Sequence, residues 1–352
     1  MGASNPLIVF ANGFRNDFMS TVSDNGRAAL RIFAGVAACF ALSAPLVTGA
    51  LAQTGDYPNR PVRLVVAYPP GGPLDTMARM LAEKLGQSLG KPVVVDNRAG
   101  AGGVIGSDLV AKAPADGYTL LFGSTPLSIQ ETLTPKLPYS ALRDFTPIAR
   151  MGDGPQVLVV GNAVPARTVA ELIGHAKSLD GKMNYASPSA GGSNHLAGEL
   201  FKLTGGFKAT HVPYKGGAAA LTDVIGGQVS FMFAAVASSM QHVEAGRLRA
   251  LGVTSKQRLA TAPQVPTIAE TLPGFEVVSW YGVLGPAGMP PAIVGRLNAE
   301  INRIIVEPDM KKRLVALDVE VTPESPAQFG EFIRQNTGMW ANVIKTAGVA
   351  AE

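Results

Sequence analysis

The hydrophobic positions of this chain follow two alternating periods from about residue 62 onwards. The β-branched run Val62–Ala67 is typical of a buried strand, and the apolar residues that follow it, from Leu74 to Leu89, are spaced for one face of a helix. Further predicted strands are 92–96, 118–123, 156–161, 184–186, 208–212, 229–233 and 248–254, and further predicted helices are 103–112, 169–179, 195–204, 291–306, 309–317 and 326–347. This alternation predicts an α/β protein with a doubly wound parallel sheet.

The alternation stops and restarts near residues 151–157, and a second break near 278–283 precedes the final helices. We therefore expect two domains, the first formed by residues 53–155 together with 282–352 and the second by residues 156–281. In such an arrangement, loops from both domains face one cleft.

Residues 27–52 have the pattern of an export signal. Arg27 and Arg31 precede a charge-free apolar stretch, which ends in the small-x-small sequence Ala50-Leu51-Ala52. We predict cleavage after Ala52, removal of residues 1–52 (of which 1–26 form an overlong leading region), and a periplasmic mature protein. Two alternatives stay open: a retained membrane anchor, and lipidation of Cys39, which follows Val36-Ala37-Ala38.

Composition narrows the function classes. The chain has 352 residues, of which 47% are hydrophobic, enough for two domain cores. Lys and Arg total 30 against 26 Asp and Glu without a basic block, so we expect no nucleic-acid partner. One cysteine and four scattered histidines exclude an internal disulfide framework and the common zinc motifs. Dinucleotide and Walker motifs are missing as well, so we expect no cofactor, no metal and no catalytic residue.

Two glycine-containing loops carry the candidate chemistry. The first, Pro69–Asp75, joins a strand to a helix, with Gly72 as the cap and Pro73 at the first helical position. The second, Ser187–His195, has hydroxyl groups and glycines at another predicted helix start. Free N–H groups at a helix N-terminus favour a carboxylate guest. For the first loop, a plain strand-to-helix turn is the alternative.

Other features of these segments are weaker. Ser124-Thr125 follows a strand end, where α/β sheets bind ligands, and Lys215 is either a charge at the cleft rim or a solvated turn residue. A nucleophilic role for Ser187 or Ser189 with His195 would make the chain a hydrolase, but the G-x-S-x-G elbow is absent.

In order along the chain, several motifs resemble the extracytoplasmic solute receptors of tripartite tricarboxylate transporters, the Bug (TctC-like) family. These motifs extend from Tyr57-Pro58 to Pro273-Gly274-Phe275-Glu276, and the whole mature chain is similar. They include Pro70-Gly71-Gly72-x-x-Asp75, Asn97-Arg98-x-Gly100-Ala101-Gly102-Gly103, Asn184-Tyr185-Ala186-Ser187-Pro188, His195-Leu196-Ala197-Gly198-Glu199, Val212-Pro213-Tyr214-Lys215-Gly216 and Val265-Pro266-Thr267-Ile268-Ala269-Glu270.

The resemblance implies a two-domain periplasmic-binding-protein (Venus-flytrap) fold, type II-like, with no enzymatic activity. It implies a monomer that hands a small organic carboxylate to one large and one small membrane permease subunit. The family's ligand-binding positions correspond here to Gly71, Gly72, Asp75, Ser187, Ser189, Gly191 and Asn194, with Ser124, Thr125, Tyr214 and Lys215 as weaker additions. A sensory receptor for a membrane signalling partner is the main alternative, and an α/β hydrolase is the other.

The sequence departs from the family pattern in its two loops. Pro73 and Leu74 stand where small or polar residues are usual, and Ser189 and Gly192 replace a usual Gly and a usual Ser or Thr. Pro73 has no N–H to donate, and Leu74 has an apolar side chain. We therefore expect a ligand with one well-held carboxylate and a less polar remainder, with citrate binding more weakly.

Overall fold

Most helices and strands form where the hydrophobic periods place them. The computed structural model describes residues 57–321 and 323–350, so the predicted export signal, its cleavage site and Cys39 lie outside the described residues. The strands are β1 (Val62–Val66), β2 (Val93–Asn97), β3 (Thr119–Ser124), β4 (Phe145–Gly161), β5 (Asn184–Ser187), β6 (Thr210–Pro213), β7 (Phe231–Ala235), β8 (Leu248–Val253), β9 (Val278–Pro286) and β10 (Glu320–Val321). The helices are α2 (Pro73–Leu89), α3 (Val104–Ala111), α4 (Pro126–Leu133), α5 (Val169–Ser178), α6 (Ser193–Gly205), α7 (Gly217–Ile225), α8 (Val236–Glu244), α9 (Pro291–Ile305), α10 (Pro308–Val315) and α11 (Pro326–Ala347), with 3-10 turns at Ala101–Gly103 and Ile268–Glu270.

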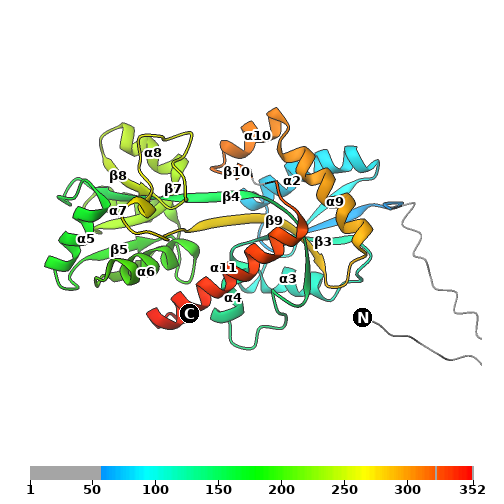
Figure 1. Ribbon diagram of the computed structural model, residues 1–352, viewed down its shortest axis with the longest axis horizontal. Coiled ribbons are helices and arrows are strands. Elements are labelled where there is room, and N and C mark those ends of the chain that lie inside the picture. Colours follow the sequence, from blue (N-terminus) through cyan, green and yellow to red (C-terminus); the bar gives the residue numbers. More distant parts are fainter. Residues whose placement is uncertain (1–56, 322, 351–352) are drawn as a thin grey trace, which may run out of the picture. The chain divides into compact units, whose positions relative to one another are not determined.

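The strands of the described residues form one hydrogen-bonded sheet in the order β2-β1-β3-β9-β4-β7-β5-β6, with β8 and β10 also paired to β4. β1 is parallel to β2 and β3, and β5 is parallel to β6 and β7. β9 and β4 are antiparallel to their neighbours. The sheet is therefore mixed, and the expectation of a purely parallel sheet is wrong, because β4 and β9 carry the chain in opposite directions between the two halves of the sheet (Figure 1).

β4 changes its partners in the middle of its length. Its residues up to Pro155 pair with β9, whereas those from Gln156 onwards pair with β7, and β8 joins from Val157. This change coincides with the boundary at 155/156 that the sequence suggests, and the second boundary, at 281/282, lies within β9. The division into two domains stays a prediction. The residue at which β4 changes its partner strand agrees with the first predicted boundary.

Each half of the sheet has hydrophobic clusters on both faces. In the half that contains β1, one cluster packs under α2, α9 and α10, and another packs near α3 and the first part of α11. In the other half, one cluster packs under α5 and α6 and the second under α7 and α8. Burial on both faces explains why strands such as β1 read as nearly continuous apolar runs.

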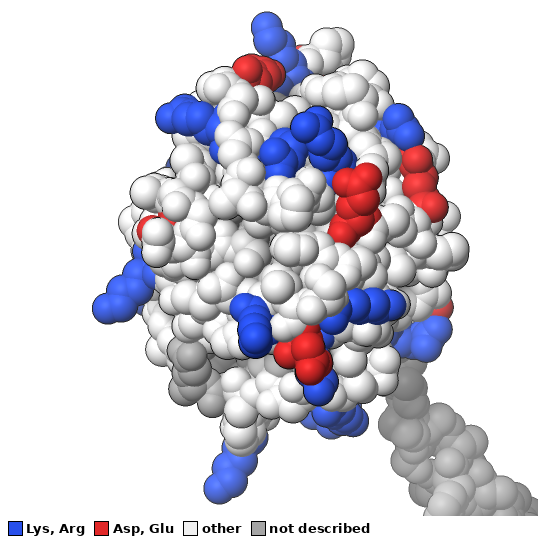
Figure 2. Space-filling model, turned by 90° about the vertical axis from the view of Figure 1, so that its left-hand side faces the viewer, with Lys and Arg blue, Asp and Glu red and all other residues white. Residues whose placement is uncertain are grey.

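The surface at the β5 and α5 end of the sheet carries both signs of charge. Figure 2 shows this face with basic and acidic side chains interspersed among uncharged ones, without a continuous basic surface. Within residues 57–321 and 323–350, no helix combines the length and the apolar composition needed to cross a membrane.

Candidate functional site

A cleft of about 580 Å³ lies where helices from both halves of the sheet begin. From the first half it is lined by the start of α2, the end of β3 and the start of α4. Ser193 of α6 comes from the second half, and Ser279 and Tyr281 come from β9. The full lining is Tyr68, Pro69, Pro70, Gly72, Pro73, Leu74, Asp75, Ser124, Thr125, Pro126, Ser193, Ser279 and Tyr281. No lysine or arginine is among these described lining residues, so the donors that the cleft offers are neutral.

The loop before α2 is held by Asp75. Gly71 has a φ of +88°, a conformation that favours glycine, and Gly72 is the N-cap with Pro73 next to it, as predicted. The Asp75 carboxylate accepts the Gly71 N–H at 2.9 Å and the Arg79 Nε–H at 3.0 Å, and its other oxygen accepts the Asn97 amide. Hydrogen bonding from Arg79 is the main influence that lowers the pKa of Asp75 to about 2. Asp75 therefore lines the cleft as an anion whose oxygens already have protein donors.

At the end of β3, Ser124 and Thr125 both line the cleft. The Thr125 hydroxyl oxygen accepts the Trp280 backbone N–H at 2.8 Å, which connects α4 to β9. Because that oxygen serves as an acceptor, the hydroxyl proton of Thr125 is left to donate to another group.

Three polar side chains meet at the start of α6. The hydroxyl oxygens of Ser193 and Ser279 are 3.2 Å apart, and Gln156 Nε2 donates to Ser193 Oγ at 3.3 Å. Gln156 is 3% exposed, and its Oε1 has no hydrogen-bond partner among the described residues. That oxygen is a hydrogen-bond acceptor, and Gln156 is not among the residues that line the cleft.

The structure places the residues of the second loop mostly outside the cleft lining. Ser187 is 0% exposed, and its hydroxyl contacts Ser189 O and His211 Nε2, each at 2.7 Å. His195 accepts the Gly191 N–H at its Nδ1, at 2.9 Å, instead of facing Ser187. This geometry opposes the hydrolase alternative, because the serine is buried and its partner is a different histidine.

The other predicted site residues of the second half also have local partners. Asn194 Nδ2 donates to Phe233 O, and the Tyr214 hydroxyl donates to Asp223. Ser189 and Lys215 are exposed. The structure thus brings Gly72, Asp75, Ser124 and Thr125 together at the cleft, and Gly71, Ser187, Ser189, Gly191, Asn194, Tyr214 and Lys215 are not part of its lining.

The remaining cleft wall is largely apolar. Three partly buried lining residues pack against the same hydrophobic cluster: Tyr68, Leu74 and Tyr281. The side chain of Leu74 therefore packs against the core and also lines the cleft. Burial and the nearby Asp318 carboxylate raise the pKa of Tyr281 to about 12.

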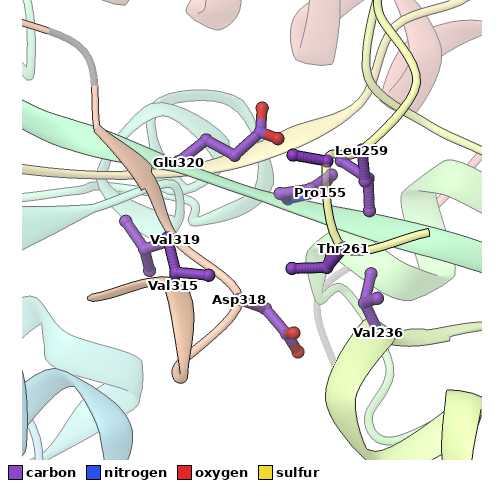
Figure 3. A pocket seen from close by; sticks show the side chains of 9 residues that line it. Pro155, Val236, Leu259, Thr261, Val315, Asp318, Val319 and Glu320 are labelled. Carbon is purple, nitrogen blue, oxygen red and sulfur yellow. The ribbon is translucent and has the colours of Figure 1, made fainter. Parts of the chain in front are cut away.

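A small hollow of about 50 Å³ contains that aspartate (Figure 3). Asp318 precedes β10 and belongs to the first half of the sheet, whereas Val236 on the other wall begins α8. Asp318 Oδ2 accepts the Ala237 N–H at 2.7 Å and thereby caps α8, which has no capping side chain of its own. This contact links the two halves of the sheet.

Sequence reasoning missed three lining residues, Tyr68, Ser279 and Tyr281, and it included Ser193 in the second loop without singling it out. Ser193 could have been found from its position, because it follows Gly192 at a helix start as Pro73 follows Gly72. Ser279 and Tyr281 carry no local signal, since β9 itself was not predicted. Among the described residues, no group of three or more His, Cys, Asp or Glu side chains is placed to hold a metal ion.

Fold and cleft together define the class of a periplasmic binding protein, and comparisons with known proteins agree. The model of the family described as "Tripartite tricarboxylate transporter family receptor" matches residues 77–349. A UPF0065 protein from the tcbD-tcbE intergenic region of Pseudomonas sp. strain P51 is 42% identical over 317 residues, covering 89% of this chain and 93% of that protein. The chain therefore belongs to the TctC (Bug) family of tripartite tricarboxylate transporter receptors, a family of binding proteins and not of enzymes.

Solved structures of similar proteins support the same fold. Rpa4515 of R. palustris, solved with adipate, is 35% identical with a TM-score of 0.69, covering 84% of this chain and 99% of that one. The periplasmic binding protein BugD is 34% identical with a TM-score of 0.67, covering 84% and 100%. MatC of Rhodopseudomonas palustris, with bound malate, is 30% identical with a TM-score of 0.66, covering 82% and 100%.

Proposed function

We propose that this chain is a periplasmic receptor that captures a small organic carboxylate in the cleft and delivers it to the membrane subunits of a tripartite tricarboxylate transporter. The observation that carries the proposal is the convergence of the starts of α2, α4 and α6 on one cleft that offers neutral donors. Helix N-termini stabilise anions through their free N–H groups and their dipoles. The carboxylates bound by two structural relatives, adipate and malate, support the same chemical class.

The proposal includes the route to the periplasm and the way in which the ligand is enclosed. Export follows cleavage after Ala52, and the mature protein is a monomer. Residues 53–155 with 282–352 form one domain and residues 156–281 the other, and they close on the ligand. The partner change of β4 at 155/156 supports this division. N-terminal sequencing of the exported protein tests the cleavage site, and a first residue other than Gln53 would refute it.

The carboxylate is tested by thermal denaturation with matched compounds. A ligand present at 100 times its Kd stabilises the folded state by about 2.7 kcal/mol. We expect at least one acid from a set of aliphatic and aromatic carboxylates to raise the melting temperature, while its neutral amide does not. An equal shift by acid and amide, or no shift by any acid, would contradict the proposal.

Delivery is tested with membrane vesicles that contain the transporter's two membrane subunits. The acid identified by denaturation should accumulate only when the purified receptor is added. If the receptor binds the acid and uptake is the same without it, the transport role is wrong and a sensory role takes its place.

A further inference from the structure

The loops before α2 and α6 have the same backbone geometry. Gly71 and Gly191 have φ values of +88° and +68°, and the glycine that follows each of them is the N-cap of the helix. In both loops, the side chain at the third helical position accepts the N–H of the first glycine at 2.9 Å. Asp75 Oδ2 does so for Gly71, and His195 Nδ1 does so for Gly191. The same turn is therefore held by two acceptors of different chemistry.

The two acceptors respond differently to acid. Hydrogen bonding from Arg79 is the main influence that lowers the pKa of Asp75 to about 2, so this carboxylate accepts the Gly71 N–H at any pH above that value. Histidine, in contrast, is the side chain that ordinarily changes its charge between about pH 5 and pH 8. A ring nitrogen that gains a proton becomes a donor and no longer accepts a hydrogen bond. The contact with Gly191 therefore requires a neutral His195.

The ring of His195 is stacked on a second histidine and faces a carboxylate. The ring centroids of His195 and His211 are 3.7 Å apart, and the rings are inclined by 11°. Because His195 Nδ1 accepts the Gly191 N–H, the hydrogen of the neutral ring is on Nε2. That nitrogen is 3.7 Å from Glu199 Oε1. A proton added at Nδ1 would thus give a charged ring beside Glu199 and would break the contact with Gly191.

The second histidine is held in its neutral form by other contacts. The Ser187 hydroxyl donates its hydrogen to Ser189 O, so His211 Nε2 is the donor in its 2.7 Å contact with Ser187 Oγ. Burial, and then His195, lower the pKa of His211 to about 4. His195 is the ring of this pair whose N–H faces the carboxylate, and we therefore expect it to take up the first proton.

Charged groups of α6 surround the histidine pair. Glu199 accepts hydrogen bonds from the Tyr185 hydroxyl at 2.6 Å and from Lys202 Nζ at 2.7 Å. Burial acts in the opposite direction, but hydrogen bonds from His195, Lys202 and Tyr185 lower the pKa of Glu199 to about 2. Lys202 acts against a positive charge on the rings, and it pairs with the same carboxylate. β7 and the last part of α11, which also pack here, contribute apolar side chains.

The second loop connects the histidine pair to the cleft. Gly192 is the N-cap of α6, and Ser193, which follows it, lines the cleft. A Cβ added to Gly191 would lie 2.7 Å from Leu133 Cδ2 at the end of α4. The loop is thus closely packed against α4, whose first residue, Pro126, also lines the cleft. A change at the Gly191 N–H is therefore expected to alter two walls of the cleft.

We propose that His195 is a positioning residue that makes the second loop sensitive to pH. The neutral imidazole holds Gly191 and the start of α6 in place, and a proton taken from solvent at Nδ1 releases them, while the first loop keeps its contact with Asp75. This inference rests on the proposed function and deepens it by naming the regulation of the cleft. The receptor binds its carboxylate less tightly in mildly acid surroundings.

The first test needs no ligand. NMR spectra of the isotope-labelled, exported receptor between about pH 8 and pH 5.5, where histidine titrates, report the charge and tautomer of His195 and the backbone amide signals. We expect the neutral ring to carry its hydrogen on Nε2, and the Gly191 amide signal to move with the same midpoint as the ring. The Gly71 amide signal should stay constant. A neutral ring with its hydrogen on Nδ1, or a Gly191 signal that does not follow the ring, would overturn the inference and leave the proposed function intact.

The second test compares two histidine variants by titration calorimetry with adipate as the probe. His195→Asn keeps an acceptor for the Gly191 N–H and does not titrate. His175→Asn is the control, because His175 lies in the last turn of α5 and outside the cleft lining. Between pH 8 and pH 5.5, the Kd should rise about 2- to 12-fold more in the wild type and the control than in His195→Asn. This factor corresponds to one neutral hydrogen bond of about 0.5–1.5 kcal/mol.

The comparison separates the loop from the probe. Protonation of adipate itself affects all three proteins equally and cancels in the ratio. An equal rise of the Kd in folded His195→Asn would overturn the inference while adipate binding still supports the proposed function. If neither adipate nor any other acid binds at either pH, the proposed function is wrong, and the ligand-free spectra still decide whether His195 controls the loop.

Discussion

Ser193 and Ser187 are two serines of one loop region with different expected roles, and replacing each by alanine separates binding from folding. Ser193 lines the cleft and contacts Ser279 and Gln156. Ser187 is fully buried and contacts His211 and Ser189. We expect Ser193→Ala to weaken ligand binding and Ser187→Ala to weaken the fold.

The magnitudes follow from what each hydroxyl contacts. A hydrogen bond to a charged group contributes about 1.5–3 kcal/mol, so loss of the Ser193 hydroxyl should raise the Kd of a carboxylate about 10- to 150-fold. Ser187→Ala leaves the imidazole Nε2 of the half-buried His211 and the Ser189 carbonyl without their partner. An unsatisfied buried group costs about 1–3 kcal/mol, so the free energy of unfolding should fall by about that amount.

Two assays on the same samples decide the matter. Titration calorimetry with the tightest-binding acid gives the Kd, and urea denaturation gives the free energy of unfolding. Ser193→Ala should change the first measurement, and Ser187→Ala should change the second. If Ser187→Ala weakens binding as much as Ser193→Ala does, with an unchanged fold, the assignment of the two serines is reversed and the cleft has been placed incorrectly.

Three further predictions concern pH, packing and closure. Burial, and then the neighbouring His195, lower the pKa of His211 to about 4 in the folded protein, whereas the pKa of histidine in an unfolded chain is about 6.5. As the pH falls, the unfolded state therefore binds the proton first, and the free energy of unfolding should fall between pH 6.5 and pH 4. His211→Gln should reduce this slope in denaturation series, and an identical slope would exclude His211 as its source. Trp340→Ala removes a fully buried side chain and should lower the free energy of unfolding by about 3–5 kcal/mol, with Trp340→Phe closer to wild type; a loss below about 1 kcal/mol would mean that the cavity collapses or that α11 packs loosely. Saturating ligand should reduce the radius of gyration in small-angle scattering, and an unchanged profile would speak against closure unless the free protein is already closed.

The strands and helices that sequence patterns predicted well are those with strong local periodicity. α2 and α11 have long apolar stripes, and both begin with proline at the first turn. α4 and α7 were missed because they have only eight and nine residues, with serine, threonine or glycine reducing the helical signal. The first half of β4 and the whole of β9 were missed because glycine and proline interrupt them, and their extended conformation depends on pairing with each other.

The candidate site shows the same limit. The loop at Gly72 was predictable because a strand, a glycine turn and a helix start are adjacent in the sequence. The contact of Ser193 with Ser279 joins residues 86 positions apart and depends on β9. The resemblance to the family pointed to the second loop, in which Ser187 at the strand end is fully buried and Ser193 at the helix start lines the cleft.

The long helix α11 restricts how the two halves of the sheet can move. Its first part places Phe329 and Ile333 in a core of the β1 half, and its last part places Trp340 and Val343 in a core of the β5 half. If the two halves of the sheet rotated widely about a hinge, α11 would have to expose one of these two sets of side chains to water. Such exposure costs about 25 cal/mol for each Å² of apolar surface. The register shifts of β4 against β9 lie before Gly152 and within the β1 half. Closure on a ligand should therefore be a small twist of β4 and β9 over α11, in which the start of α6 approaches the α2 loop while the buried side chains of α11 keep their contacts.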